Sequence, residues 1–127
     1  MILSEHFTDE EFRCKCQREP CPAPTQPSAD LVEGLERLRA MLQQPVIITS
    51  GIRCEPYNRL VGGAPTSDHL TGEGADLLIT DGHMAFLYMR AAVWLFPRVG
   101  FGRRDRDKNL TFHVGVSQAV KDVLWTY

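Results

Sequence analysis

Two short apolar segments of the sequence each carry one polar residue at a position that folding should bury. Asp76 stands inside the run Gly-Ala-Asp-Leu-Leu-Ile at 74–79, and His113 stands between Phe112 and Val114. Apolar runs of this length, bounded by glycine-containing turns, are typical of buried β-strands. Because an unpaired buried charge is strongly destabilising, Asp76 must meet a cation, a set of hydrogen-bond donors or a metal ion. The fold must therefore bring a partner to each of these polar residues.

A second histidine, His69, precedes Asp76 by seven residues. Two imidazoles and one carboxylate supply three protein ligands, the number with which a catalytic zinc ion keeps its fourth position for water. Each residue alone has a simpler interpretation, since Asp76 can pair with an arginine and a lone histidine on an apolar strand is more often a hydrogen-bonded core residue. Together, His69, Asp76 and His113 predict a metal site, and their nitrogen and oxygen donors favour zinc.

The pattern S-x-H-x-x-G-x-x-x-D at 67–76, followed by Phe-His-Val at 112–114, resembles the motif of the zinc D-Ala-D-Ala carboxypeptidases and endopeptidases of the hedgehog/DD-peptidase fold. The segments at 7–16 and 45–65 also resemble one branch of that family, so the similarity covers most of the chain. The resemblance implies a zinc metallopeptidase that hydrolyses a D-amino-acid-containing amide bond in peptidoglycan stem or cross-link peptides, as a carboxypeptidase or an endolysin-type endopeptidase. The zinc ligands it implies are His69, Asp76 and His113.

The same resemblance implies two substrate-binding residues. Arg53 is similar to the arginine that meets the substrate's carboxylate, which suits a guanidinium fork that can bind a carboxylate through two hydrogen bonds. Ser67 is expected to hydrogen-bond the substrate backbone. Simpler roles stay open for both residues, because Arg53 can pair with Asp68 or Asp76 and Ser67 can shape the turn before His69.

The general base of such a peptidase is not evident in the sequence. Related enzymes have an acidic residue a few positions before the last histidine, whereas here Asn109 and Leu110 stand four and three positions before His113. Asp105 and Asp107 lie further back in a polar turn, and Asp107 is the preferred catalytic candidate because its reach is shorter. Both can equally be solvated turn residues. The alternative function is therefore a catalytically silent relative that keeps the metal for stability or binds cell-wall peptide without cutting it.

Two glycines also depart from the family pattern. Gly115 stands two residues after His113, where relatives often have aspartate, and Gly74 stands where alanine is usual. No reason for either glycine is evident from the sequence.

Four cysteines, Cys14, Cys16, Cys21 and Cys54, leave three alternatives open. They can be free thiols, form disulfides or hold a structural zinc ion, although the Cys-x-Cys-x4-Cys spacing is not that of a standard zinc ribbon. We favour structural disulfides or a thiol cluster that ties the N-terminal segment to the Arg53 loop. Either arrangement requires Cys54 to pack closely against one of the first three.

Helical periodicity predicts one amphipathic helix with particular clarity. Ser28 can cap its N-terminus, leucines recur at intervals of four, three and four from Leu31 to Leu42, and Pro45 ends it. A helix that begins at Asp81 and runs to Phe96 is apolar over much of its length, which predicts heavy burial. Shorter helical segments are predicted at 4–12 and 55–61.

Strands are predicted at 46–49, 74–79, 99–103 and 110–116, and residues 120–127 can be helix or strand. The predicted architecture is a single α+β domain over 1–127, in which a small antiparallel sheet has helices packed against it. His69 would stand at the start of one strand, Asp76 within it and His113 on its neighbour. The three ligands can then converge on one face.

Composition limits the remaining functions. The 127 residues are 43% hydrophobic with a net charge of −2, which suits one compact, monomeric domain and argues against nucleic acid as a partner. The longest apolar stretch, 84–96, is interrupted by Arg90 and is too short to span a bilayer. The N-terminus lacks the basic head and apolar core of a signal peptide. We therefore expect a protein that is cytoplasmic as synthesised and acts on the cell wall after release, as a phage lysin does, although a chain trimmed of its signal fits equally well.

Overall fold

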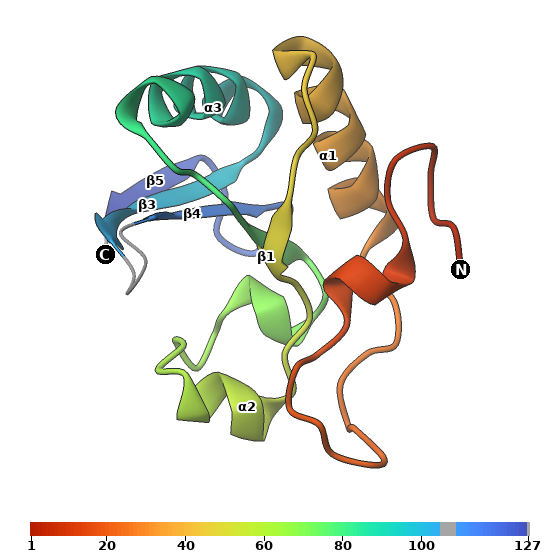
Figure 1. Cartoon of the computed structure of the whole chain (residues 1–127). Coiled ribbons are helices and arrows are strands. Elements are labelled where there is room, and N and C mark those ends of the chain that lie inside the picture. The colour runs from red at the N-terminus through yellow and green to blue at the C-terminus, as the bar shows by residue number, and fades with distance from the viewer. Residues whose placement is uncertain (105–108, 127) are drawn as a thin grey trace.

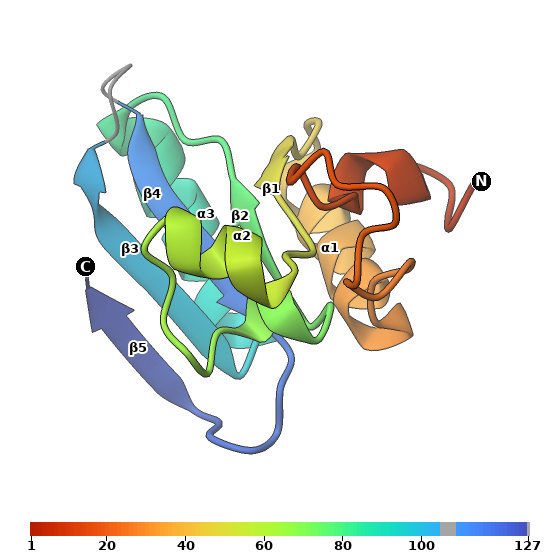
Figure 2. The ribbon, with the colours of Figure 1, turned by 90° about the horizontal axis from the view of Figure 1, so that it is seen from below.

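A computed structural model describes residues 1–104 and 109–126 of the protein. It contains a five-stranded sheet in the order β1-β2-β4-β3-β5. Helix α3 covers one face of this sheet and packs beside α1, while the short α2 lies over the opposite face (Figures 1 and 2). The strands are β1 (Ile48–Ser50), β2 (Gly74–Leu77), β3 (Arg98–Arg104), β4 (Leu110–Gly115) and β5 (Val123–Thr126), and the α-helices are α1 (Ala29–Leu42), α2 (Glu55–Leu60) and α3 (Gly82–Leu95). Short 3-10 helices span Asp9–Phe12 and Asp68–Leu70.

The predicted α+β fold is confirmed, and all pairs among the four predicted strands are antiparallel. The C-terminal segment, which the sequence left open between helix and strand, forms β5. It pairs with β3 in parallel, so the complete sheet is mixed. The first predicted strand is shifted, because β1 begins at Ile48 although the apolar run begins at Val46.

Helix α1 follows its sequence pattern closely. The Ser28 side chain accepts a hydrogen bond from the Asp30 backbone, and the helix buries four apolar residues, Leu31, Val32, Leu35 and Leu38. Burial of each leucine contributes about 1.5–3 kcal/mol, so this face fixes α1 against the core. Gln43 ends the helix in the left-handed conformation, two residues before Pro45.

Helix α3 departs from its prediction of heavy burial. Asp81 caps it by accepting a hydrogen bond from the Met84 backbone, and Tyr88 is fully buried. Phe86 and Trp94 are nevertheless 62% and 82% exposed. The apolar composition of α3 therefore does not bury every side of the helix. Because α3 lies on the outer side of the sheet, only one of its faces contacts the core.

Strand register brings the two polar residues of the apolar runs together. Asp76 in β2 pairs with His113 in β4, and Asp76 is also the partner of Ser50 in β1. The 3-10 helix Asp68–Leu70 precedes β2 and is joined to it by a short turn. This turn places the His69 ring next to the Asp76 side chain. The fold thus supplies each polar residue with the partner that its burial requires.

None of the helices in the described part of the chain has the length and apolar character needed to cross a membrane.

Candidate metal centre

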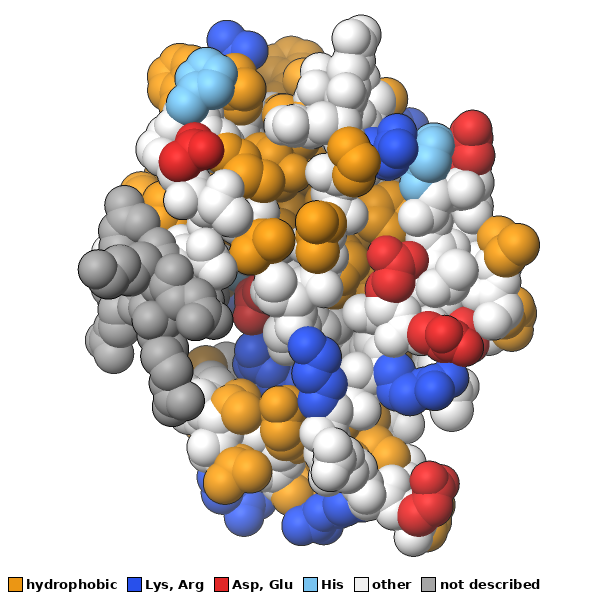
Figure 3. Space-filling view, viewed as in Figure 1, with side chains coloured by type: hydrophobic (Ala, Val, Ile, Leu, Met, Phe, Trp, Pro, Cys, Tyr) orange, Lys and Arg blue, Asp and Glu red, His pale blue; other side chains and the backbone are white. Residues whose placement is uncertain are grey.

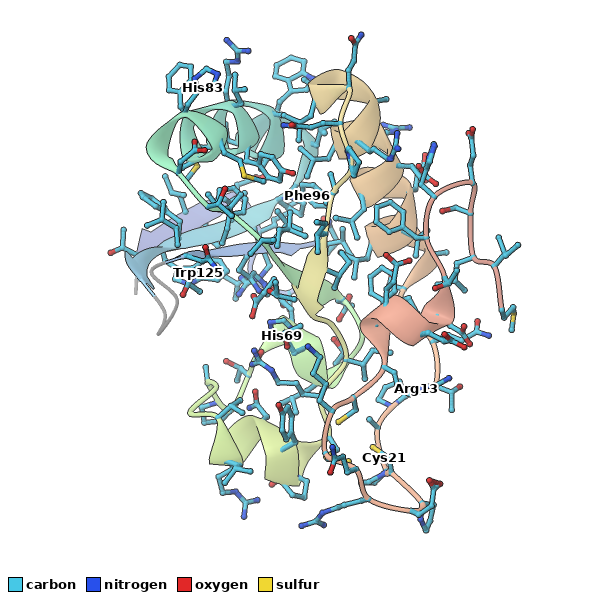
Figure 4. The ribbon with its side chains drawn as sticks, in the orientation of Figure 1. Arg13, Cys21, His69, His83, Phe96 and Trp125 are labelled. Atoms are coloured by element: carbon cyan, nitrogen blue, oxygen red, sulfur yellow. The ribbon has the colours of Figure 1, made fainter. Side chains whose placement is uncertain are left out.

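The structure brings together the three predicted metal ligands. His69 Nε2 lies 3.1 Å from Asp76 Oδ1, His113 Nδ1 lies 3.1 Å from the same oxygen, and the two nitrogens are 3.2 Å apart. Both histidines are 3% exposed, so the three donor atoms meet at the floor of the site rather than on its surface. Figure 4 shows His69 between the sheet and α2.

The triangle has the size that a tetrahedral zinc ion requires. Ligand bonds of about 2.1 Å place neighbouring ligand atoms about 3.4 Å apart, close to the three observed separations. The observed separations are about 0.3 Å shorter than those of a tetrahedral zinc site. A zinc ion therefore fits between His69, Asp76 and His113 if the three side chains move by only a few tenths of an ångström.

Hydrogen bonds at the outer nitrogens set the protonation of both rings. His69 Nδ1 faces the carbonyl oxygen of Gly51, and His113 Nε2 faces Asp68 Oδ2 at 3.1 Å. Because these oxygens only accept hydrogen bonds, each outer nitrogen carries the proton, and each inner nitrogen of a neutral ring presents a lone pair. With Asp76 Oδ1, three acceptor atoms then face one another, an arrangement that needs a cation at its centre.

The electrostatics of the site agree with this conclusion. Burial opposes a charged imidazole, yet the carboxylates of Asp68 and Asp76 outweigh it and raise the pKa of His113. Burial likewise opposes the charge on Asp76, but the hydrogen bonds that His113 and His69 donate when their inner nitrogens are protonated hold the pKa of that carboxyl well below its usual range. The centre therefore attracts positive charge, either as a proton or as a metal ion.

Arg53 binds the outer oxygen of the Asp76 carboxylate. Its Nη2 donates to Asp76 Oδ2 at 3.1 Å, its Nε donates to Ser50 Oγ and its Nη1 donates to Asn58 Oδ1, each at 3.2 Å. Asp76 thus directs one oxygen at the metal position and the other at Arg53. The pairing that the sequence left open for Arg53 is present, and contact with a substrate stays a prediction.

Sequence reasoning missed a second group of residues behind His113. Arg98 Nε donates to Asp68 Oδ2 at 2.8 Å, and the Arg98 guanidinium lies 5.1 Å from the ring centre of Trp125. Trp125 in turn lies 5.3 Å from the His113 ring. Asp68 was the residue that the sequence could have revealed, because it stands next to His69 in the motif while the usual aspartate after His113 is missing.

Both unexplained glycines make room for this group. A side-chain carbon at Gly115 would collide with the Asp68 carboxylate, and one at Gly74 would stand 2.6 Å from His113 Cε1 and from Asp68 Cβ. Asp68 approaches His113 through the space that a side chain at position 115 would fill. The position of the Asp68 carboxylate therefore depends on glycine at both 74 and 115.

The donor triangle opens into a cleft of about 620 Å³. Ser67, Thr111 and Trp125 line it, together with Arg53 and Arg98. Lys and Arg side chains also gather across the middle of the face shown in Figure 3. The cleft is thus suited to a ligand that carries negative charge.

The predicted catalytic aspartates, Asp105 and Asp107, lie outside the described residues. Among the residues that the structure does describe, the carboxylates lining the cleft are Asp68 and Asp76. Both are engaged by arginine and histidine. Glu73, the remaining acidic residue beside the motif, accepts a hydrogen bond from Thr71 at an exposed position.

Comparison with protein families identifies the relationship. The sequence model of the Peptidase M15 family matches residues 5–110, a range that includes Arg53, His69 and Asp76 and ends just before His113. No match was found among curated proteins. The match covers most of the chain and confirms the resemblance to zinc peptidases. The chain therefore belongs to the Peptidase M15 family, the family of zinc D-Ala-D-Ala carboxypeptidases.

Proposed function

We propose that the protein is a zinc-dependent peptidase that hydrolyses a D-amino-acid-containing amide bond in peptidoglycan peptides. The observation that carries this proposal is the convergence of three acceptor atoms, from His69, Asp76 and His113, at the floor of an open cleft. Three protein ligands leave a position for water, whereas a purely structural zinc site normally has four. When bound, the zinc ion polarises the scissile carbonyl and lowers the pKa of water from about 15.7 toward about 7.

The residues around the cleft bind and orient the peptide. Arg53 lines both this cleft and an adjoining cavity of about 510 Å³, so its guanidinium can meet a substrate carboxylate while its Nη2 stays on Asp76. Ser67 already accepts a hydrogen bond from the His69 backbone, and its hydroxyl can donate to a substrate carbonyl. Arg98 also lines the cleft and adds positive charge there. These contacts favour a short peptide with a free carboxylate.

Hydrolysis also requires a group that accepts the proton of the attacking water. We assign this role to Asp107, with Asp105 as the second candidate. Support comes from connectivity, because the segment 105–108 joins β3 to β4 and Thr111, early in β4, lines the cleft. Asp107 and Asp105 stand four and six residues before Thr111, so a base in this segment can reach the substrate.

A silent relative remains the second candidate function, and one observation favours it. Within the described part of the cleft, both lining carboxylates are already paired and neither is free to accept a proton. On this alternative the same cleft binds a carboxylate-bearing cell-wall peptide without cutting it.

The two functions separate in one experiment. Purified zinc-loaded protein is incubated with uncross-linked and cross-linked peptidoglycan fragments, and the products are separated and weighed by mass spectrometry. Release of D-alanine indicates a carboxypeptidase, and cleavage of the cross-link indicates an endopeptidase. The His113→Ala variant is the control, because it removes one of the three ligands. Fragments that bind but stay intact with zinc present would overturn the peptidase proposal in favour of the silent relative.

A further inference from the structure

A second cluster of metal-binding side chains lies outside the lining of the cleft that holds the three donor atoms. The sulfur atoms of Cys14, Cys16, Cys21 and Cys54 all lie within 4.8 Å of one another. Three of these residues come from the N-terminal loop, and Cys54 immediately precedes α2. Figure 4 shows Cys21 in that loop, away from His69. None of the four belongs to the donor triangle or lines its cleft.

The cluster has the dimensions of a four-sulfur zinc site. Zinc–sulfur bonds of about 2.3 Å place the sulfurs of a tetrahedral site about 3.8 Å apart. Here Cys16 and Cys21 have a sulfur separation of 3.4 Å, and every other pair is within the 4.8 Å limit. All four cysteines are unpaired in the structure. Disulfides bring sulfurs together two at a time, whereas a mutual approach of all four is what one central ion imposes.

Backbone amides point at the sulfur atoms. The Arg18 N–H donates to Cys16 Sγ and the Cys54 N–H donates to Cys14 Sγ, each at 3.3 Å. Two of the four sulfurs therefore accept a backbone hydrogen bond. Such donors stabilise thiolates, the form in which cysteine binds metal.

The loop that carries three of the cysteines has little other means of holding its shape. Residues 13–28, all of which the structure describes, contain neither helix nor strand. Cys54 is 2% exposed, but Cys14, Cys16 and Cys21 are only partly buried. A segment that buries so little apolar surface gains most from a cross-link or a bound ion.

We propose that Cys14, Cys16, Cys21 and Cys54 bind one structural zinc ion as four thiolates. Binding releases the thiol protons to solvent, and four protein ligands leave no open position for water, so this ion has no catalytic part. It fastens the N-terminal loop to the segment 53–54. Because Arg53 adjoins Cys54 and holds the Asp76 carboxylate, the second ion also supports the wall of the cleft.

Metal analysis of the full chain, purified under reducing conditions without chelators, tests the proposal. Wild type is expected to hold about two zinc ions, and His113→Ala about one. Cys21→Ser should also hold about one, retained at the histidine site, and the variant with both changes should hold none. Far-UV circular dichroism compares the secondary structure of the Cys21→Ser variant with that of wild type and so tests whether the variant is folded. Because the variants count the histidine site and the cysteine site separately, a missing ion at one site can be distinguished from a missing ion at the other.

Cobalt substitution identifies the ligands in a folded protein without altering any cysteine. His113→Ala loaded with Co²⁺ should show an intense thiolate-to-cobalt charge-transfer absorption, which chelation abolishes. The proposal is overturned if this variant holds no metal, or if its Co²⁺ spectrum lacks that absorption. It is also overturned if the mass of the denatured, unreduced wild type shows the hydrogen loss of disulfides.

Discussion

Asp68 Oδ2 lies 3.1 Å from His113 Nε2 and so holds the outer nitrogen of a candidate metal ligand. Arg98 holds the same oxygen from the other side, at 2.8 Å. The carboxylate fixes both the orientation of the His113 ring and the nitrogen that carries its proton. Asp68 thus acts on the site through His113 rather than by touching the metal position itself.

Replacing Asp68 with alanine should lower the zinc affinity of the histidine site about 10- to 100-fold, the usual effect of removing a partner of a ligating histidine. A competition titration against a chromophoric chelator measures the change. Asp30→Asn, at an exposed position on α1, is the control and should leave zinc affinity unchanged. Equal affinity in wild type and Asp68→Ala would contradict the positioning role.

Gly115→Ala should destabilise the protein, because the added carbon would collide with the Asp68 carboxylate. We expect a loss of about 1–3 kcal/mol in the free energy of unfolding, measured by denaturant titration. Gly82→Ala is the matched control, since nothing lies within 4 Å of the carbon added there. In an Asp68→Gly background, Gly115→Ala should lower the free energy of unfolding much less. An equal loss in both backgrounds would show that the two positions are independent.

Arg53→Lys tests substrate binding. Lysine keeps the charge but loses the two-pronged geometry, so affinity for a peptide with a free carboxylate should fall about tenfold, or about 1.4 kcal/mol. Calorimetric titration measures the affinity, and zinc content is determined in parallel because Arg53 also contacts Asp76. Arg37→Lys, at an exposed position on α1 outside both cavities, is the control. An unchanged dissociation constant with full zinc content would make Arg53 a structural partner of Asp76 alone.

Glu36 links stability to pH. Burial opposes its charge, but hydrogen bonds from Ser4 and His6 outweigh this effect and lower the pKa of Glu36. A lowered folded-state pKa stabilises the fold above the unfolded pKa, about 4.3, and this contribution is lost as pH falls through the folded value. Glu36→Gln should therefore cost about 1 kcal/mol at pH ~7, and the deficit should shrink in acid. Denaturant titrations over a pH series measure it, with Glu33→Gln, exposed on the same helix, as control. If the loss of stability in Glu36→Gln were the same in acid as at neutral pH, the charge of Glu36 would not be the source of its contribution.

The sequence predicted the donor triangle because its signal is local. Asp76 and His113 each interrupt an apolar strand, and the strand register then places them opposite each other. Asp68 stands beside His69 in the motif, but nothing in the sequence pattern pairs it with Arg98, because Arg98 does not interrupt an apolar run. The pairing becomes visible only in the folded chain, where the 3-10 helix Asp68–Leu70 and the first residue of β3 come within hydrogen-bond distance.

Parts of the fold were beyond sequence reasoning for a similar reason. Val123–Thr126 alternates between partly buried and exposed residues, which is compatible with a strand, but nothing in four residues specifies pairing with β3 or its parallel direction. The exposure of Phe86 and Trp94 on α3 depends on which face of that helix meets the sheet. Such choices are settled by long-range packing rather than by local pattern.

Asp107→Ala tests the assignment of the general base. If Asp107 accepts the proton of the attacking water, turnover of peptidoglycan fragments should fall about 100-fold or more, the usual scale for such a group. Zinc content should not change, because the donor atoms belong to His69, Asp76 and His113. Asp105→Ala is the companion variant, and a loss confined to it would move the role to Asp105. If both variants cleave like wild type, the base lies elsewhere in the chain.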